Sequence, residues 1–133
     1  MRVLGFNYTK VSAERLEKLE KITKIVQNIE FTNVEKDEVT LMKESEILKV
    51  SFKYSLKYEP KNVNIVLEGL IIISASQDLV KQALKSWKKK QLDDELRMDL
   101  VKLILNKCTL KSLVLEEELG VPHHIKLVKV SAE

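Results

Sequence analysis

The sequence predicts an α+β fold in which a four-stranded antiparallel sheet packs against two C-terminal helices. Residues 47–58 and 63–74 alternate between apolar and polar side chains, as strands with one buried face do. After residue 76 the apolar residues recur at helical spacing instead. With 133 residues, three glycines and two prolines, the chain suits a single domain over residues 1–133.

The strand predicted over residues 47–58 has the clearest pattern. One of its faces carries Lys49, Lys53 and Lys57 between serines, and a shift of one residue in register would move these lysines into the core. The opposite face is expected to lie against the helices. It consists of Leu48, Val50, Phe52, Tyr54, Leu56 and Tyr58.

A turn at Pro60 is expected to join this strand to an antiparallel partner over residues 63–74. The outer face of the partner loses its polarity at Leu70 and Ile72. A strand that is apolar on both faces is normally covered on both sides. We therefore expect a helix or another subunit to cover that end.

Alternation near the N-terminus predicts a first strand over residues 4–13. Residues 14–28 carry a mixed signal, because some of their apolar residues recur at helical spacing and others alternate. We expect a short helical turn over residues 14–21, followed by a strand over residues 25–34.

Two helices are expected after the hairpin. Ser74 or Ser76 can cap the first, whose apolar stripe leads to Trp87 and whose end is marked by three lysines that complement the helix dipole. The second is expected to begin near Asp93 or Asp94, to break near residues 106–109 and to end at Gly120. Residues 121–130 are expected to be extended.

No motif for catalysis, metal binding or phosphate binding is present in the sequence. Three glycines do not form a glycine-rich phosphate loop. His123 and His124 are adjacent, so on an extended chain they point to opposite faces and chelate a metal poorly. Cys108 is expected to be a buried, inert thiol, and Glu116 with its two acidic neighbours to lie on a solvated face. We therefore expect a binding protein without cofactor or metal, not an enzyme.

Charge and composition narrow the partners and the compartment. A formal charge of +3 from 23 basic and 20 acidic residues is an even mixture, which makes nucleic acid an unlikely partner. The longest apolar run, residues 70–73, is far too short to enter a membrane, and the N-terminus lacks a secretory signal, so the cytoplasm is expected. Abundant Lys and Glu with one Cys is typical of thermophilic proteins.

The order of these elements resembles SecB-type export chaperones. Residues 4–12 (LGFNYTKVS) are similar to the family's opening strand, and residues 121–127 (VPHHIKL) to the proline-led segment after its main helix. The central hairpin and the helix pair lie between them, so the resemblance covers nearly the whole chain. The resemblance suggests an archaeal-type homologue of this family.

This resemblance implies an ATP-independent holdase that binds unfolded polypeptide or preprotein through apolar grooves and serves protein transport. It also implies a homotetramer built as a dimer of dimers. Under this hypothesis the groove residues are Phe31, Tyr54, Tyr58 and Trp87, although the pattern alone favours a core position for the two tyrosines. The alternative is a small non-enzymatic adaptor module that contacts RNA through the lysine-rich strand face.

Overall fold

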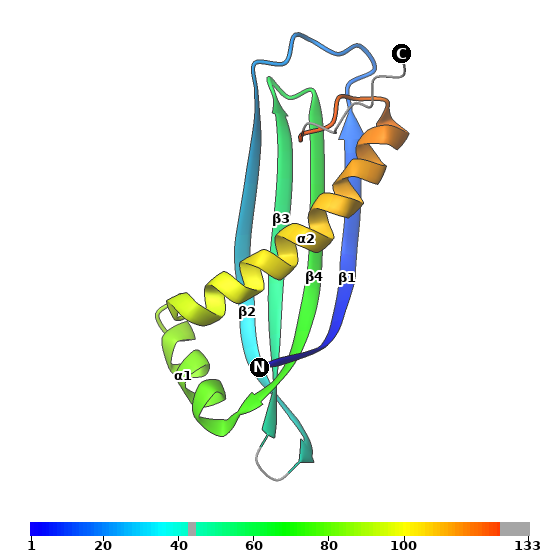
Figure 1. Cartoon of the computed structure of the whole chain (residues 1–133). Coiled ribbons are helices and arrows are strands. Elements are labelled where there is room, and N and C mark those ends of the chain that lie inside the picture. Colours follow the sequence, from blue (N-terminus) through cyan, green and yellow to red (C-terminus); the bar gives the residue numbers. More distant parts are fainter. Residues whose placement is uncertain (43–44, 126–133) are drawn as a thin grey trace, which may run out of the picture.

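The computed structural model describes residues 1–42 and 45–125. Four strands precede two helices: β1 (Arg2–Arg15), β2 (Lys24–Met42), β3 (Ser45–Glu59), β4 (Val63–Ser76), α1 (Gln77–Trp87) and α2 (Asp94–Leu119). The strands form one antiparallel sheet in the order β1-β4-β3-β2, and α2 crosses one face of it obliquely (Figure 1). The predicted α+β architecture is therefore confirmed. Within the described part of the chain, no helix has the length and apolar character needed to span a membrane.

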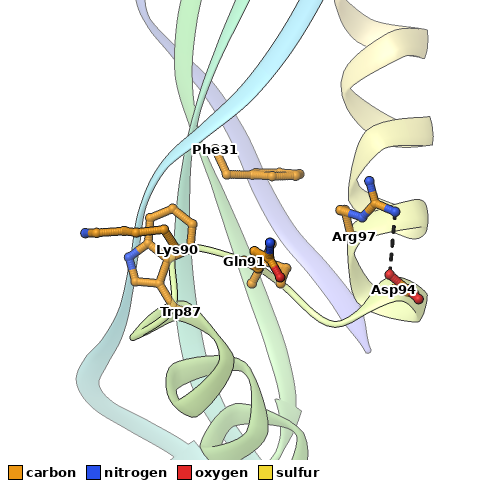
Figure 2. A pocket seen from close by; sticks show the side chains of 7 residues that line it. Phe31, Trp87, Lys90, Gln91, Asp94 and Arg97 are labelled. Carbon is orange, nitrogen blue, oxygen red and sulfur yellow. Dashed lines mark ion pairs between the residues drawn. The ribbon is translucent and has the colours of Figure 1, made fainter.

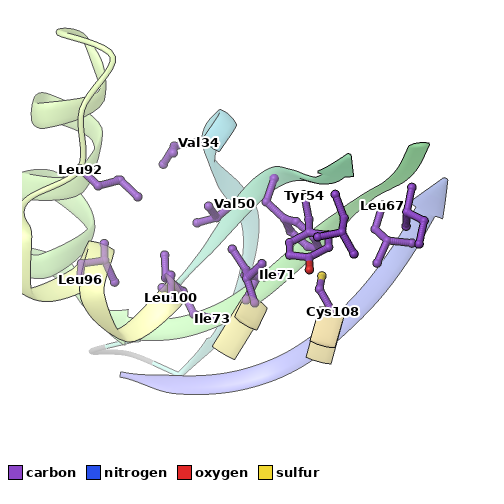
Figure 3. Close-up of a cluster of buried hydrophobic side chains, with 14 of the residues drawn as sticks. Val34, Val50, Tyr54, Leu67, Ile71, Ile73, Leu92, Leu96, Leu100 and Cys108 are labelled. Atoms are coloured by element: carbon purple, nitrogen blue, oxygen red, sulfur yellow. The ribbon is translucent and has the colours of Figure 1, made fainter. Parts of the chain in front are cut away.

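The core lies between the sheet and α2. The register pairs Leu48 with Ile73 and Tyr54 with Leu67, and all four side chains are fully buried. From α2, Leu100 joins them (Figure 3). The predicted inward face of β3 is confirmed. Its lysines lie on the opposite face because side chains alternate along a strand.

Gly69 allows a close approach at the centre of the sheet. A Cβ atom there would lie 2.5 Å from the backbone oxygen of Asn7 and 2.8 Å from the ring of Phe52. Phe52 is opposite Gly69 in the β3–β4 register, so its ring occupies the space that a side chain would need. The absence of a side chain at residue 69 thus makes room for a core aromatic residue.

The helical turn predicted over residues 14–21 is wrong. β1 continues to Arg15, and the chain then runs without a helix to the start of β2. The fully buried side chain of Asn62 accepts a hydrogen bond from the backbone nitrogen of Glu20 (2.7 Å) and donates one to its carbonyl oxygen (3.0 Å). Because both backbone groups of Glu20 are bound across the hairpin turn, they are not available to a helix.

The predicted break in the second helix is also wrong, since α2 runs for 26 residues. The 106–109 stretch contains neither Gly nor Pro, and Cys108 within it packs into the core. The predicted end at Gly120 is confirmed, because Gly120 has a φ of 66° and caps the helix. Arg15 of β1 donates a hydrogen bond to the last helical carbonyl, that of Leu119 (2.7 Å).

The end of β2 differs from the prediction, and the start of α1 decides between two predicted caps. β2 extends well beyond Val34 because its backbone continues to pair with β3, for example Glu35 with Lys49. The first helix is capped by Ser76, whose hydroxyl accepts from the nitrogen of Leu79 (3.2 Å). Residues 121–123, in the stretch predicted to be extended, belong to neither a helix nor a strand, and the chain bends at residues 124–125. Residues 126–130 of that prediction lie outside the described part of the chain.

Candidate functional site

A pocket of about 360 Å³ opens where the connection between α1 and α2 passes the edge strand β2. Three of its seven lining residues are apolar, two of them aromatic, and the other four are polar or charged. Figure 2 shows the ring of Phe31 above Gln91, with Trp87, the last residue of α1, to one side and below. The lining residues are Phe31, Trp87, Lys90, Gln91, Leu92, Asp94 and Arg97.

The sequence after α1 fixes the shape of this pocket. The chain turns sharply at Lys90, which has a φ of 59°, and the backbone nitrogen of Lys90 donates to the carbonyl of Trp87 (2.8 Å). This turn places the ammonium group of Lys90 5.3 Å from the centre of the Trp87 ring, within the range of a cation–π interaction. One face of the indole is thus held by its own loop.

The rim of the pocket carries more positive than negative charge. Arg97 from the first turns of α2 lies 3.5 Å from the carboxylate of Asp94, and both side chains are well exposed. Lys90 adds a second cation, while Leu92 lies almost fully buried at the base. Two partly exposed aromatic side chains, Phe31 and Trp87, beside a cationic rim can receive an apolar side chain of an extended polypeptide segment.

The structure brings together two of the four predicted groove residues and separates the other two. Phe31 and Trp87 are partly exposed and share the pocket. Tyr54 and Tyr58 are 0% exposed beneath α2, so no ligand reaches them in this conformation. Sequence analysis treated Lys90 only as one of three lysines at the end of a helix and did not single out Leu92 or Arg97, because only the fold brings the α1–α2 connection next to β2.

The three tyrosines of the chain each meet a polar residue of α2, and these polar residues are spaced by four. The hydroxyl of Tyr8 lies 4.0 Å from the sulfur of Cys108. Tyr54 adjoins Ser112, although neither hydroxyl has a full hydrogen bond among the described residues, and Figure 3 shows the Tyr54 hydroxyl directed towards Cys108. The third tyrosine, Tyr58, donates to the carboxylate of Glu116. This row of contacts runs from the partly buried Tyr8 to the fully buried Tyr58 and aligns α2 with the sheet.

Burial dominates the acid–base properties of this row. It raises the pKa of Tyr8, and proximity to Cys108 adds to the effect. Burial also raises the pKa of Tyr54, and it raises that of Tyr58, where the hydrogen bond to Glu116 contributes further. The predicted burial of Cys108 is confirmed, and burial raises the pKa of its thiol to about 11, which disfavours the reactive thiolate.

Glu116 is fully buried, so its predicted solvated position is wrong. Its carboxylate accepts from the backbone nitrogen of His124 (2.8 Å) and lies 2.7 Å from the Nδ1 atom of the same residue. The carboxylate and imidazole side chains are 0% and 3% exposed, respectively. A carboxylate–imidazole pair can act as a general base, but a substrate has no access to this one. We interpret it as a structural link between α2 and the following segment.

The lysine-rich face of β3 does not form a free cationic surface. Lys49 lies 3.6 Å from Asp37, and Lys53 is opposite Glu30 on one neighbouring strand and Glu68 on the other. Nucleic acid binds where lysines outnumber nearby carboxylates. The alternating charges on this face therefore do not favour the RNA-contacting alternative.

Comparison with known proteins found a similar fold among the solved structures. No protein-family model matches the chain, and a search of curated proteins found no match. A solved structure, the Mycobacterium tuberculosis Rv1957 SecB-like chaperone in complex with a ChAD peptide from the Rv1956 HigA1 antitoxin, is similar at a TM-score of 0.50 and 8% identity. The similarity covers 99% of this chain and 91% of that one.

This chain therefore has a SecB-like α+β fold. At 8% identity the likeness extends to the fold alone. The narrower affiliation with archaeal homologues stays a prediction.

Proposed function

We propose that the protein is an ATP-independent holdase that binds unfolded polypeptide at the pocket between Phe31 and Trp87. The observation that carries this proposal is an open, aromatic-walled pocket beside an edge strand, on a SecB-like fold. The similar solved chaperone was determined with a peptide bound, which supports a polypeptide as the ligand class.

The neighbourhood of the pocket suits an extended ligand. β2 pairs only with β3, so one row of its backbone groups is unpaired within the sheet. Ile25 and Ile29 lie on the same face of β2 as Phe31 and are partly exposed. A client strand can bind along such an edge through its backbone while an apolar side chain enters the pocket, a mode that tolerates many sequences.

A non-enzymatic role accords with the chemistry of the described residues. The nucleophile Cys108 is buried with a raised pKa, and the Glu116–His124 pair is closed to substrate. Apolar capture requires no nucleotide, which suits a chain without a glycine-rich loop. A cytoplasmic location and a role in preprotein transport belong to the same proposal.

We also propose that the chain self-associates, as a dimer of dimers, through a surface formed by β1 and the exposed side of α2. β1 is the other edge of the sheet, and Val11 on it is 45% exposed. α2 packs over this edge through the Tyr8 and Arg15 contacts, and it exposes Leu110 to 67%. Apolar side chains exposed together on an edge strand and its helix are typical of an interface between subunits.

The function is tested by suppression of aggregation of unrelated unfolding proteins, without nucleotide. We expect the wild type to retain most of this suppression at about 0.5 M salt, because salt does not weaken apolar contacts. The Phe31→Ser variant should lose most of the activity while it remains folded at the assay temperature, although its melting temperature should fall somewhat because Phe31 also packs against the core. Val26→Ser, on the same strand but the opposite face, is the matched control. A well-folded wild type that protects no client contradicts the proposal.

A further inference from the structure

The positive charge of the chain is concentrated in one segment. Residues 77–92, which form α1 and the start of its connection to α2, hold five of the 23 basic residues and one of the 20 acidic ones. The rest of the chain then has 18 basic and 19 acidic residues, so this segment accounts for the whole positive excess. Because positive charge is balanced in the rest of the chain and concentrated in residues 77–92, this segment is expected to attract a negatively charged partner.

The lysines of this segment are exposed and close to the pocket. Lys81, Lys85, Lys88 and Lys89 follow one another at intervals of four, three and one residues, which places them on neighbouring sides of α1 and its end. Each is exposed, and none of them lies within ion-pairing distance of a carboxylate in the part of the chain that the structure describes.

A second hollow connects these lysines to the pocket. It has a volume of about 520 Å³ and includes Lys85 and Lys89. Three of its lining residues also line the first pocket, namely Gln91, Leu92 and Asp94. Two carboxylates are present, those of Asp93 and Asp94, and the second of these is paired with Arg97. The two hollows thus lie on either side of one connecting segment, the first with an aromatic wall and the second with a lysine wall.

We propose that this surface selects unfolded segments in which an apolar residue is flanked by acidic residues. This inference rests on the proposed holdase function and specifies its client class. The apolar side chain enters between Phe31 and Trp87, and the flanking carboxylates reach the lysines of α1. Nucleic acid is the less suitable polyanion, because Lys90 covers one face of the single tryptophan and the rest of the chain has no positive excess.

The test uses the fluorescence of Trp87, the chain's single tryptophan, as a reporter at the pocket itself. Three peptides of equal length share one apolar centre and carry glutamate, glutamine or lysine flanks. At about 50 mM salt we expect the glutamate peptide to bind about tenfold more tightly than the lysine peptide, because several exposed ion pairs add up. At about 500 mM salt the three affinities should converge to within about twofold.

A triple variant separates charge selection from apolar capture. Lys85→Gln, Lys88→Gln and Lys89→Gln together should abolish the preference for the glutamate peptide and leave the affinity for the glutamine peptide unchanged. The substituted side chains are exposed, so the fold should be retained.

The matched control removes three other exposed lysines, at Lys18, Lys21 and Lys57, and should keep the preference. Equal affinity of the wild type for all three peptides overturns this inference and leaves the holdase proposal intact, whereas failure to bind any peptide overturns both. If a single-stranded oligoribonucleotide binds more tightly than the glutamate peptide, the lysines form a nucleic-acid site instead, and the inference is overturned. If the triple variant no longer self-associates, the three lysines bind a second copy of the chain. That result also overturns the inference that they select acidic clients.

Discussion

The Nδ1 atom of His124 lies 2.7 Å from the Oε1 atom of Glu116, and the pair is almost completely buried. Glu116 also accepts from the backbone nitrogen of His124 and from the hydroxyl of Tyr58. The carboxylate therefore connects three parts of the molecule: α2, β3 and the segment that follows Gly120. Pairing and hydrogen bonding offset the cost of burying this charged group.

Replacing either member of this pair should destabilise the protein. We expect Glu116→Ala and His124→Ala each to lower the free energy of unfolding by about 2–4 kcal/mol, because each leaves a buried polar partner unsatisfied. The double variant should cost less than the sum of the two, with a coupling energy of about 1–3 kcal/mol. Chemical denaturation measures all three values, and strictly additive losses would show that the two side chains do not depend on each other.

Tyr54 and Tyr58 should respond differently to loss of the hydroxyl. Tyr58→Phe removes a donor from the buried carboxylate of Glu116 and should cost about 1–3 kcal/mol. Tyr54→Phe removes a buried hydroxyl without a full hydrogen bond among the described residues, so it should be neutral or slightly stabilising. Thermal unfolding of the two variants gives this comparison directly. An equal loss in both would contradict the assigned contacts.

The protein should lose stability in alkaline solution. Burial raises the pKa of Tyr8, Tyr54 and Tyr58 above the ordinary value of 10.0, and that of Cys108 from 9.0 to about 11. Each group thus stabilises the fold fully below its unfolded pKa. This contribution declines as the pH rises above that value, by up to about 1.4 kcal/mol per pH unit for each proton that only the folded state retains.

Two measurements check this pH dependence. Because the chain has three tyrosines and all of them are in this row, phenolate absorbance should appear together with unfolding and not before it. Cys108→Ala should remove the part of the decline that begins near pH 9 and keep the part that begins near pH 10. Ionisation of all three tyrosines near pH 10 with the fold intact would be inconsistent with their burial.

Gly69→Ala should be strongly destabilising and Gly5→Ala nearly neutral. A Cβ atom at residue 69 would meet a backbone oxygen at 2.5 Å, whereas one at residue 5 would meet only side-chain atoms, at 3.7 Å and 3.9 Å. The first contact forces a shift of the backbone or of Phe52, at a cost of about 1–3 kcal/mol or more. Denaturant titration of both variants checks the contrast, and a harmless Gly69→Ala would mean that β1 moves away easily.

Local patterns in the sequence determined the elements that depend on periodicity. The alternation over β3 and β4 specifies both strands and their buried faces, because a shift of one residue would bury lysines. Residue type alone identified Gly120 as a helix end, since a left-handed residue favours glycine, and it limited the first helix cap to Ser74 or Ser76, since a cap needs a short hydroxyl side chain. These properties depend on near neighbours in the chain, and a sequence displays near neighbours directly.

Only the tertiary structure decided the features that join distant segments. Asn62 binds both backbone groups of Glu20, and this contact overrides the helical spacing of the 14–28 stretch. The same holds for the buried Glu116, whose partners Tyr58 and His124 come from other parts of the chain. The candidate site itself arises where the residues after α1 meet Phe31 of β2. Hydrogen bonds and burial across such separations depend on how the chain folds back on itself, so they are not encoded in any local pattern of residue types.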